Sequence, residues 1–299
     1  MGDPVNSLVG QETSIEEREE LREALGLNEP VFVQFANFVG RTVQGQFGVS
    51  YRLGRPVGDI LAERLPATLE LSIVAGLMAL AIGIPMGVYT GLRPQHWASK
   101  ICLSVSLFGI SLPPFLIGIL LILFFGVLLG WLPTHGRGEV VDLGGWTTGL
   151  LTASGLKSIL MPALTLCVFQ LALIVRLVRS EMLEVLRTDF IKFARARGLT
   201  NQAVHFGHAL KNTLVPVVTI TGLQIGSIIA FAIVTETVFQ WPGIGFLFLQ
   251  AITFVDIPVM AAYLVLVSLF FVAINLTVDL FYYAIDPRLR VDTRGLLGN

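Results

Sequence analysis

The chain has 299 residues, of which 54% are hydrophobic and only 14% are charged, and its mean hydropathy is +0.76. Soluble globular chains carry about 25% charged residues, so this composition excludes that class and predicts an integral membrane protein. The net charge of -1 offers no basic surface for nucleic acid. The opening residues, MGDPVNSL, have neither a basic region nor an apolar core, so they do not form a signal peptide.

Residues 1–66 form a polar region that contains helices of its own. Ser14 and Glu17 have the spacing of a capping box ahead of the sequence EEREELREAL, and Gly26 can end that helix. A second helix is expected to start at residues 28–30, with an apolar face of Val31, Phe32, Phe35 and Phe38. We interpret this region as a small amphipathic subdomain that lies on the membrane surface or packs on the helical bundle.

Residues 71–89 form the first apolar segment, close to the roughly 20 residues that a helix needs to cross the hydrocarbon core. Small residues recur in it every four positions, and this spacing predicts tight packing against another helix. They are Ala75, Ala79, Gly83 and Gly87. We interpret Glu70, at the outer end of the segment, as an interfacial carboxylate with a structural role.

Residues 101–132 are longer than a straight crossing requires, and Pro113 and Pro114 interrupt them. We expect either a tilted helix with a kink at this pair or a broken helix. The loop that follows is rich in glycine and carries only Arg137 and Lys157 as cations, which predicts an outside position. The sequence GLKS within it lacks the glycines of a phosphate-binding loop, so we do not expect this chain to hydrolyse ATP.

Two further apolar segments, 159–175 and 214–235, contain polar residues at mid-membrane depth, namely Gln170, Gln224 and Ser227. Polar groups at that depth face protein or water rather than lipid. They are therefore candidates for lining a translocation pathway, and hydrogen bonding between helices is the alternative interpretation.

A cationic loop separates these two segments, and residues 187–202 within it have the pattern helix, stop, helix. Gly198 suits the left-handed position after a helix end, and Thr200 can cap the helix that follows. Phe190, Ile191 and Ala194 can share one helical face. Because Lys and Arg concentrate here, we place the loop on the cytoplasmic side, where it can meet a soluble partner.

A turn, WPGIG at 241–245, precedes a short apolar segment, 246–255, that we expect to be a surface or partly re-entrant helix. The final span covers residues 258–285, in which Asn275 and Asp279 lie one helical turn apart and are interpreted as structural. Five crossings, with the N-terminal region outside and the C-terminus inside, place the cationic short loops in the cytoplasm.

Three motifs at consistent spacing carry a resemblance: ARARGL at 194–199, HALKNTLVP at 208–216 and ETVFQWPGIG at 236–245. Together they resemble the membrane permease subunit of peptide-type (dipeptide, oligopeptide, nickel) ABC importers, a binding-protein-dependent transport family. The resemblance extends from about residue 2 to residue 290. It implies an all-α integral membrane protein of the cell (inner) membrane, a permease bundle with five transmembrane helices in this chain.

The full family pattern has six transmembrane helices, and residues 2–4 resemble the family segment just after the first. We therefore expect the family's first helix to lie upstream of this sequence, which an apolar segment in the same upstream reading frame would support. The resemblance divides the chain into an extracytoplasmic helical region at 1–66, a permease domain at 67–290 and a C-terminal tail at 291–299. A cytoplasmic coupling loop is expected at 179–213.

The resemblance also implies that this loop holds a coupling helix that docks on an ATP-binding subunit. The expected coupling residues are Asp189, Phe190, Lys192, Ala194, Arg195, Arg197, Gly198 and Leu199. Lys192 and Phe193 stand where the general importer loop has Glu and Ala, a departure that the peptide-type branch tolerates.

The implied complex contains a second homologous permease, two ATP-binding subunits and an extracytoplasmic substrate-binding protein, all at a lipid bilayer. ATP and Mg²⁺ would bind to the partner subunits, with no cofactor on this chain, which would form half of the pathway for peptides or a related small solute. No His/Cys cluster indicates a metal site. The alternatives are an ATP-independent channel or secondary carrier and, less favoured, a structural scaffold. Ionisable residues in mid-span would favour the channel or carrier, but here they cluster at span ends.

Overall fold

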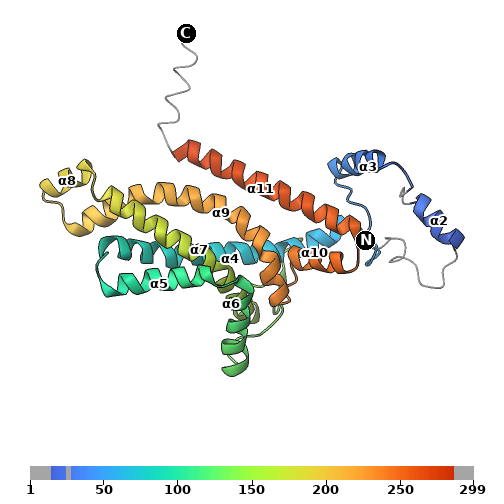
Figure 1. Cartoon of the computed structure of the whole chain (residues 1–299), viewed down its shortest axis with the longest axis horizontal. Helices are drawn as coiled ribbons and strands as arrows, with labels where there is room; N and C mark the ends of the chain where they lie inside the picture. The colour runs from blue at the N-terminus through green and yellow to red at the C-terminus, as the bar shows by residue number, and fades with distance from the viewer. Residues whose placement is uncertain (1–14, 25–27, 286–299) are drawn as a thin grey trace, which may run out of the picture.

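The computed structural model describes residues 15–24 and 28–285, so Ser14, Gly26 and residues 286–299 lie outside the described chain. The elements in chain order are α2 (Ile15–Ala24), α3 (Val31–Val43), α4 (Val57–Leu92), α5 (Trp97–Ser111), α6 (Pro114–Leu121), the π-helix η1 (Ile122–Leu128), β1 (Val141–Asp142), β2 (Thr147–Thr148), α7 (Ala153–Val185), α8 (Asp189–Ala196), the π-helix η2 (Ala203–Ala209), α9 (Leu210–Val238), α10 (Ile244–Thr253) and α11 (Ile257–Ile285). The long helices run side by side, with α8 at one end of the bundle and α10 at the other (Figure 1).

The centre of the bundle is the pair α4 and α7, which the small-residue stripe of α4 brings together. A Cβ atom added to Gly87 would lie 2.5 Å from Cβ of Val178, and one added to Gly83 would lie 2.8 Å from Ile174. Real side chains do not approach so closely, so only glycine permits this separation of the two backbones. The predicted tight packing is confirmed, although α4 begins at Val57 and therefore runs through the boundary expected at residue 66.

Four helices are long and apolar enough to cross a membrane: α4, α7, the η2 and α9 segment Ala203–Ile229, and the segment Ile257–Val278 of α11. A fifth crossing exists if α5 and the α6–η1 segment, which meet at an angle of 107°, count as one span. The described chain thus has four membrane helices, or the predicted five when the bent pair counts as one span.

The expected interruption at the proline pair is a full break rather than a kink. Leu112 and Pro113 both precede a proline and both have extended backbone, with ψ of 135° and 138°. Two successive extended residues end α5, and Pro114 starts α6 at a position where no backbone N–H is needed. The α6 segment then projects sideways from the bundle (Figure 1).

Both helices predicted in the N-terminal region are present as α2 and α3. The side chains of Phe32 and Phe35 in α3 are 87% and 65% exposed, and no residue of this helix is buried by the described chain. The placement of this region on a membrane surface or on the bundle remains a prediction.

Residues 48–56 are held against the corner between α10 and α11 by the carboxylate of Asp256. This side chain is 3% exposed and accepts hydrogen bonds from the Ser50 hydroxyl and from the backbone N–H groups of Tyr51 (3.1 Å) and Arg52 (3.3 Å). Burial, together with the nearby Asp256 charge, raises the pKa of Tyr51. The predicted short helix after the WPGIG turn is confirmed as α10.

The glycine contact between α4 and α7 yields a stability prediction. Gly87→Ala inserts a methyl group where Val178 already lies, and overpacking of this kind costs about 1–3 kcal/mol. The matched control is Gly58→Ala in the same helix, because a Cβ there meets nothing within 4 Å. Thermal unfolding in detergent should show a lower Tm for Gly87→Ala alone. Equal Tm values for the two variants would show that the glycine stripe does not set the helix separation.

Candidate coupling site

The predicted pattern of helix, stop and helix at residues 187–202 is present. α8 ends at Ala196, Gly198 adopts a φ of +79°, and the Thr200 hydroxyl accepts a hydrogen bond from the backbone N–H of Ala203 at 3.3 Å. A glycine at Gly198 avoids the strain that a side chain would bring in the left-handed region. The element is a compact hairpin at one end of the bundle (Figure 1).

One face of α8 is buried against its own bundle. Ile191 is fully buried and Ala194 is 6% exposed, and both belong to a core cluster that includes Met182 of α7 and Val204 of η2. Ala194, predicted as a coupling contact, therefore lies on the side that anchors the helix. Phe190, expected to share that face, is 44% exposed and lies at its edge.

The opposite face of α8 is exposed and mixes apolar and charged side chains. Lys192 pairs with Asp189 across one helical turn at 2.8 Å, and the Arg197 guanidinium lies 5.9 Å from the centre of the Phe193 ring. The exposed members of the coupling surface, as we define it, are Asp189, Phe190, Lys192, Phe193, Arg195, Arg197 and Leu199. Such a surface suits contact with another protein.

Phe193 is not among the predicted coupling residues, yet its side chain is 64% exposed, more than that of any other large apolar residue of α8. Its spacing of three residues from Phe190 was the sequence signal that places both on one side of a helix. An exposed aromatic residue of this kind is characteristic of interface anchors.

Of the three pathway candidates, the structure brings Gln170 and Gln224 together. The Gln170 side chain is buried, and its Nε2 donates to the backbone carbonyl of Gln224 at 3.3 Å, joining α7 to α9. Its Oε1 atom has no hydrogen-bond partner in the described chain. Gln224 and Ser227 are half-buried. Gln170 thus forms the interhelical hydrogen bond of the alternative interpretation.

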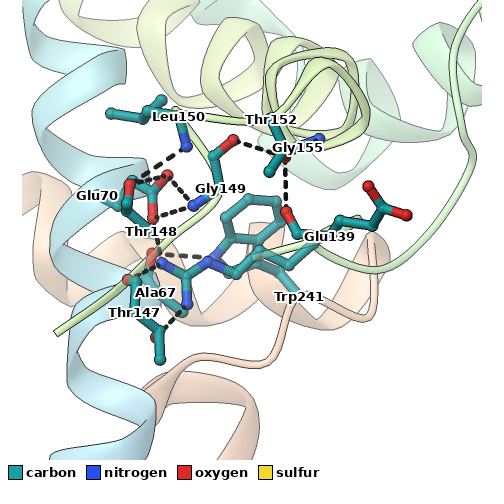
Figure 2. A network of polar contacts seen from close by, with 11 residues as sticks. Ala67, Glu70, Glu139, Thr147, Thr148, Gly149, Leu150, Thr152, Gly155 and Trp241 are labelled. Atoms are coloured by element: carbon teal, nitrogen blue, oxygen red, sulfur yellow. Dashed lines mark hydrogen bonds and ion pairs between the residues drawn. The ribbon is translucent and has the colours of Figure 1, made fainter. Parts of the chain in front are cut away.

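A polar network occupies the other end of the bundle, opposite α8. Arg137, from the loop before α7, forms a buried ion pair with Glu70 of α4 and also donates to the Thr147 carbonyl at 2.6 Å. Glu70 further accepts the backbone N–H of Gly149 at 3.1 Å, and Figure 2 shows this carboxylate beside Gly149. The loop is therefore fastened to α4.

The sequence predicts an interfacial carboxylate at Glu70 and a charged loop residue at Arg137. The structure leaves them only 4% and 7% exposed and makes them partners. A structural role for Glu70 is supported, but its interfacial exposure is wrong, because the loop folds back over it. No local sequence signal joins two residues separated by 67 positions.

Comparison with known proteins identifies the family. The profile described as "Binding-protein-dependent transport system inner membrane component" matches residues 83–291, and the profile for the N-terminal part of such membrane components matches residues 1–72. The chain belongs to this family. The permease is therefore a multi-pass membrane protein, as the resemblance of its motifs implied.

Several curated relatives match nearly the whole permease. It is 37% identical over 301 residues to the dipeptide transport system permease protein DppB of Alkalihalophilus pseudofirmus, covering 97% of this chain and 90% of that protein. It is 37% identical to the glutathione transport system permease protein GsiC of Escherichia coli strain K12, covering 97% of this chain and 89% of that protein. The probable D,D-dipeptide transport system permease protein DdpB of the same strain is 39% identical, covering 96% and 88%.

Solved structures agree on the fold. An inward-facing conformation of the MetNI methionine ABC transporter matches with a TM-score of 0.60 at 20% identity, covering 76% of this chain and 96% of that one. An amino acid ABC transporter matches with a TM-score of 0.54 at 12% identity, covering 76% and 94%. The chain is a permease subunit of an ABC importer, a class in which separate ATP-binding subunits hydrolyse ATP and a binding protein delivers substrate.

The buried ion pair yields a second stability prediction. Arg137→Ala leaves the Glu70 carboxylate buried without its counter-ion, and breaking a buried pair costs about 3–5 kcal/mol. The control is Arg55→Ala, which removes the exposed ion pair with Glu63 and should change stability little. Unfolding in mixed detergent micelles measures both. Similar losses in the two variants would contradict the assignment of Arg137 as the fastener of the loop.

Proposed function

We propose that this permease carries peptides and that α8 is the helix through which an ATP-binding subunit drives it. The observation that supports coupling at α8 most directly is the division of its two faces. Ile191 and Ala194 anchor the helix in the bundle core, while the coupling surface presents Phe193 and Arg195 to the outside. A helix that is anchored on one face and exposed on the other can follow the movement of a docked subunit and transmit that movement to α7 and α9.

Peptide cargo is supported by the named relatives, two of which transport dipeptides and one of which transports glutathione, itself a short peptide. These relatives align with this chain over almost their full length. Within the cavity between two permeases, the half-buried Gln224 and Ser227 are the proposed polar contacts along the pathway, and the buried Gln170 holds α9 beside them through its hydrogen bond to the Gln224 carbonyl.

We place the α8 end in the cytoplasm and the Glu70 and Arg137 end outside. The distribution of cations supports this orientation, because Arg187, Lys192 and Arg195 gather beside α8. The protein is then a multi-pass protein of the cell (inner) membrane. Its residues 1–66 are extracytoplasmic, where they can meet the binding protein, and its C-terminus is cytoplasmic.

The proposed assembly pairs this chain with a second homologous permease, so that each contributes half of the pathway. Each permease docks on one of two ATP-binding subunits, which hold ATP and Mg²⁺, and this chain carries no cofactor of its own. When ATP draws these subunits together, α8 moves with its subunit. Because Ile191 shares one core cluster with Met182 and Val204, the movement passes into α7 and α9 and switches access from the outside to the inside.

The assembly is tested by purifying the full chain from its native membrane in mild detergent and identifying the proteins that copurify. A second permease and ATP-binding subunits are expected. Proteoliposomes of the complex should then take up radiolabelled dialanine or glutathione only when ATP and the binding protein are supplied. Uptake by this chain alone, independent of ATP, would instead establish the channel or carrier.

The coupling surface yields a third prediction. Phe193→Ala and Arg195→Ala should lower ATP-dependent uptake by about tenfold or more, since interface anchors of this kind contribute about 2 kcal/mol. The matched control is Phe108→Ala on α5, whose side chain is 66% exposed. All three variants should insert into the membrane normally.

Gly198→Val should behave like the coupling variants, because a β-branched residue is strained at the φ of +79° that the turn after α8 requires. A pull-down of each permease variant shows how much permease is present and how much ATP-binding subunit it retains. The first quantity reports expression and the second reports docking. Wild-type uptake in Phe193→Ala and Arg195→Ala would remove α8 from the coupling pathway.

A further inference from the structure

Glu236, in the last turns of α9, is a fully buried carboxylate that the transport model above does not use. It belongs to the motif ETVFQWPGIG, yet no ion pair joins it to a Lys or Arg within the described residues. Its oxygens instead accept hydrogen bonds from the Thr68 hydroxyl of α4 at 2.5 Å and from the backbone N–H of Phe246 in α10 at 2.8 Å. One side chain therefore contacts two other helices.

The Thr68 hydroxyl extends this contact, because it also accepts the backbone N–H of Ile244 at 2.9 Å. Ile244 and Phe246 lie in the first turn of α10, where backbone N–H groups have no partner within the helix. Glu236 and Thr68 together satisfy them, and the Glu236 oxygens lie at the positive end of the α10 dipole. The carboxylate acts as a helix cap supplied by a different helix.

Two features of the WPGIG turn depend on this arrangement. A Cβ atom on Gly243 would collide with the Glu236 carboxylate and the Thr68 hydroxyl, so the position must be glycine. Trp241, fully buried, donates from Nε1 to the carbonyl of Ala67 at 2.9 Å, one residue from Thr68. The turn is thus fastened to α4 at two adjacent residues.

A buried carboxylate without a counter-ion is costly unless all of its hydrogen-bond partners are in place. Here the partners come from α4 and α10, so the set is satisfied in only one relative placement of α4, α9 and α10. At the other end of the bundle, α4, α7, α9 and α8 share one core cluster, which includes Ala79, Ile191 and Val217. A second core cluster, which includes Ala67 and Trp241, lies beside the Glu236 contact, and Met78 of α4 packs against both clusters, so packed side chains connect α8 to that contact.

We infer that Glu236 is a positioning residue for transport: its contact with Thr68 makes the end of the bundle opposite α8 move as one unit with the helices that α8 drives. The inference rests on the proposed function in taking α8 as the point that receives the ATP-driven movement. Without the contact, α8 still moves and ATP is still hydrolysed, but α4 and α10 no longer follow α9, and access switches incompletely.

The test removes the Thr68 hydroxyl rather than the carboxylate. Thr68→Val keeps the side-chain shape while leaving Glu236 and the Ile244 N–H without their shared partner, and Thr68→Ser restores the hydroxyl. The matched control is Thr165→Val, because Thr165 is equally buried at 1% exposed but bonds only to the Met161 carbonyl of its own helix. All variants are studied in the full complex.

Two readouts are measured. Electron paramagnetic resonance reports the distance between spin labels on Ala62 of α4 and Ile252 of α10, both exposed, with Cys102 and Cys167 replaced. Proteoliposomes report labelled dialanine or glutathione transported per ATP hydrolysed. We expect one narrow distance, independent of nucleotide, in the wild type, Thr68→Ser and Thr165→Val. In Thr68→Val the distance should broaden, and transport per ATP should fall about fivefold or more.

A Thr68→Val complex with the wild-type distance and ratio would overturn the inference. So would equal losses of ATP hydrolysis and transport, since a purely structural role predicts those. If the wild-type complex carries neither peptide, the proposed cargo fails, but the label distances and the ATP hydrolysis of Thr68→Val still decide the inference.

Discussion

The close approach of α4 and α7 is the contact on which the rest of the bundle depends. In lipid, helices gain little by burying apolar surface against each other, so their association relies on close packing and hydrogen bonds. The small residues of α4 let Ile174 and Val178 of α7 reach its backbone. Once α4 and α7 are packed together, the positions of the two ends of the bundle are fixed relative to each other. One end carries the α8 hairpin, and the other carries the polar contacts of Glu70 and Glu236.

The two ends use different chemistry for different purposes. At the α8 end an apolar core cluster holds the hairpin and leaves one face for a soluble partner. At the other end, three buried carboxylates, Glu70, Glu236 and Asp256, each bind a loop or turn through backbone N–H groups. Hydrogen bonds from backbone N–H groups to a carboxylate are directional, whereas apolar contact tolerates sliding. The polar end therefore specifies which loop lies where, at the expense of desolvating three charged groups.

Much of this architecture was predictable from the chain because it follows from local pattern. Apolar length predicted the crossings, the stripe from Ala75 to Gly87 predicted the contact face of α4, and Gly198 with Thr200 predicted the hairpin that carries α8. The ordered motifs predicted the family, which the comparisons confirmed over nearly the whole chain. The exposed face of α8 followed from helical periodicity, although Phe193 was overlooked and Ala194 lies on the anchoring side.

What the sequence determined by itself was the class of protein, the helices and the family, since composition and periodicity report whether a segment meets lipid, water or another helix. Only the tertiary structure decided the direction of the break after Ser111, the burial of Arg137 on Glu70 and the contact of Glu236 with Thr68, whose residues are separated by 168 positions. The sequence around an Asp or Glu does not show whether its carboxylate is solvated or buried in the folded protein. Its partner exists only once distant segments have packed, and that packing is a property of the whole fold.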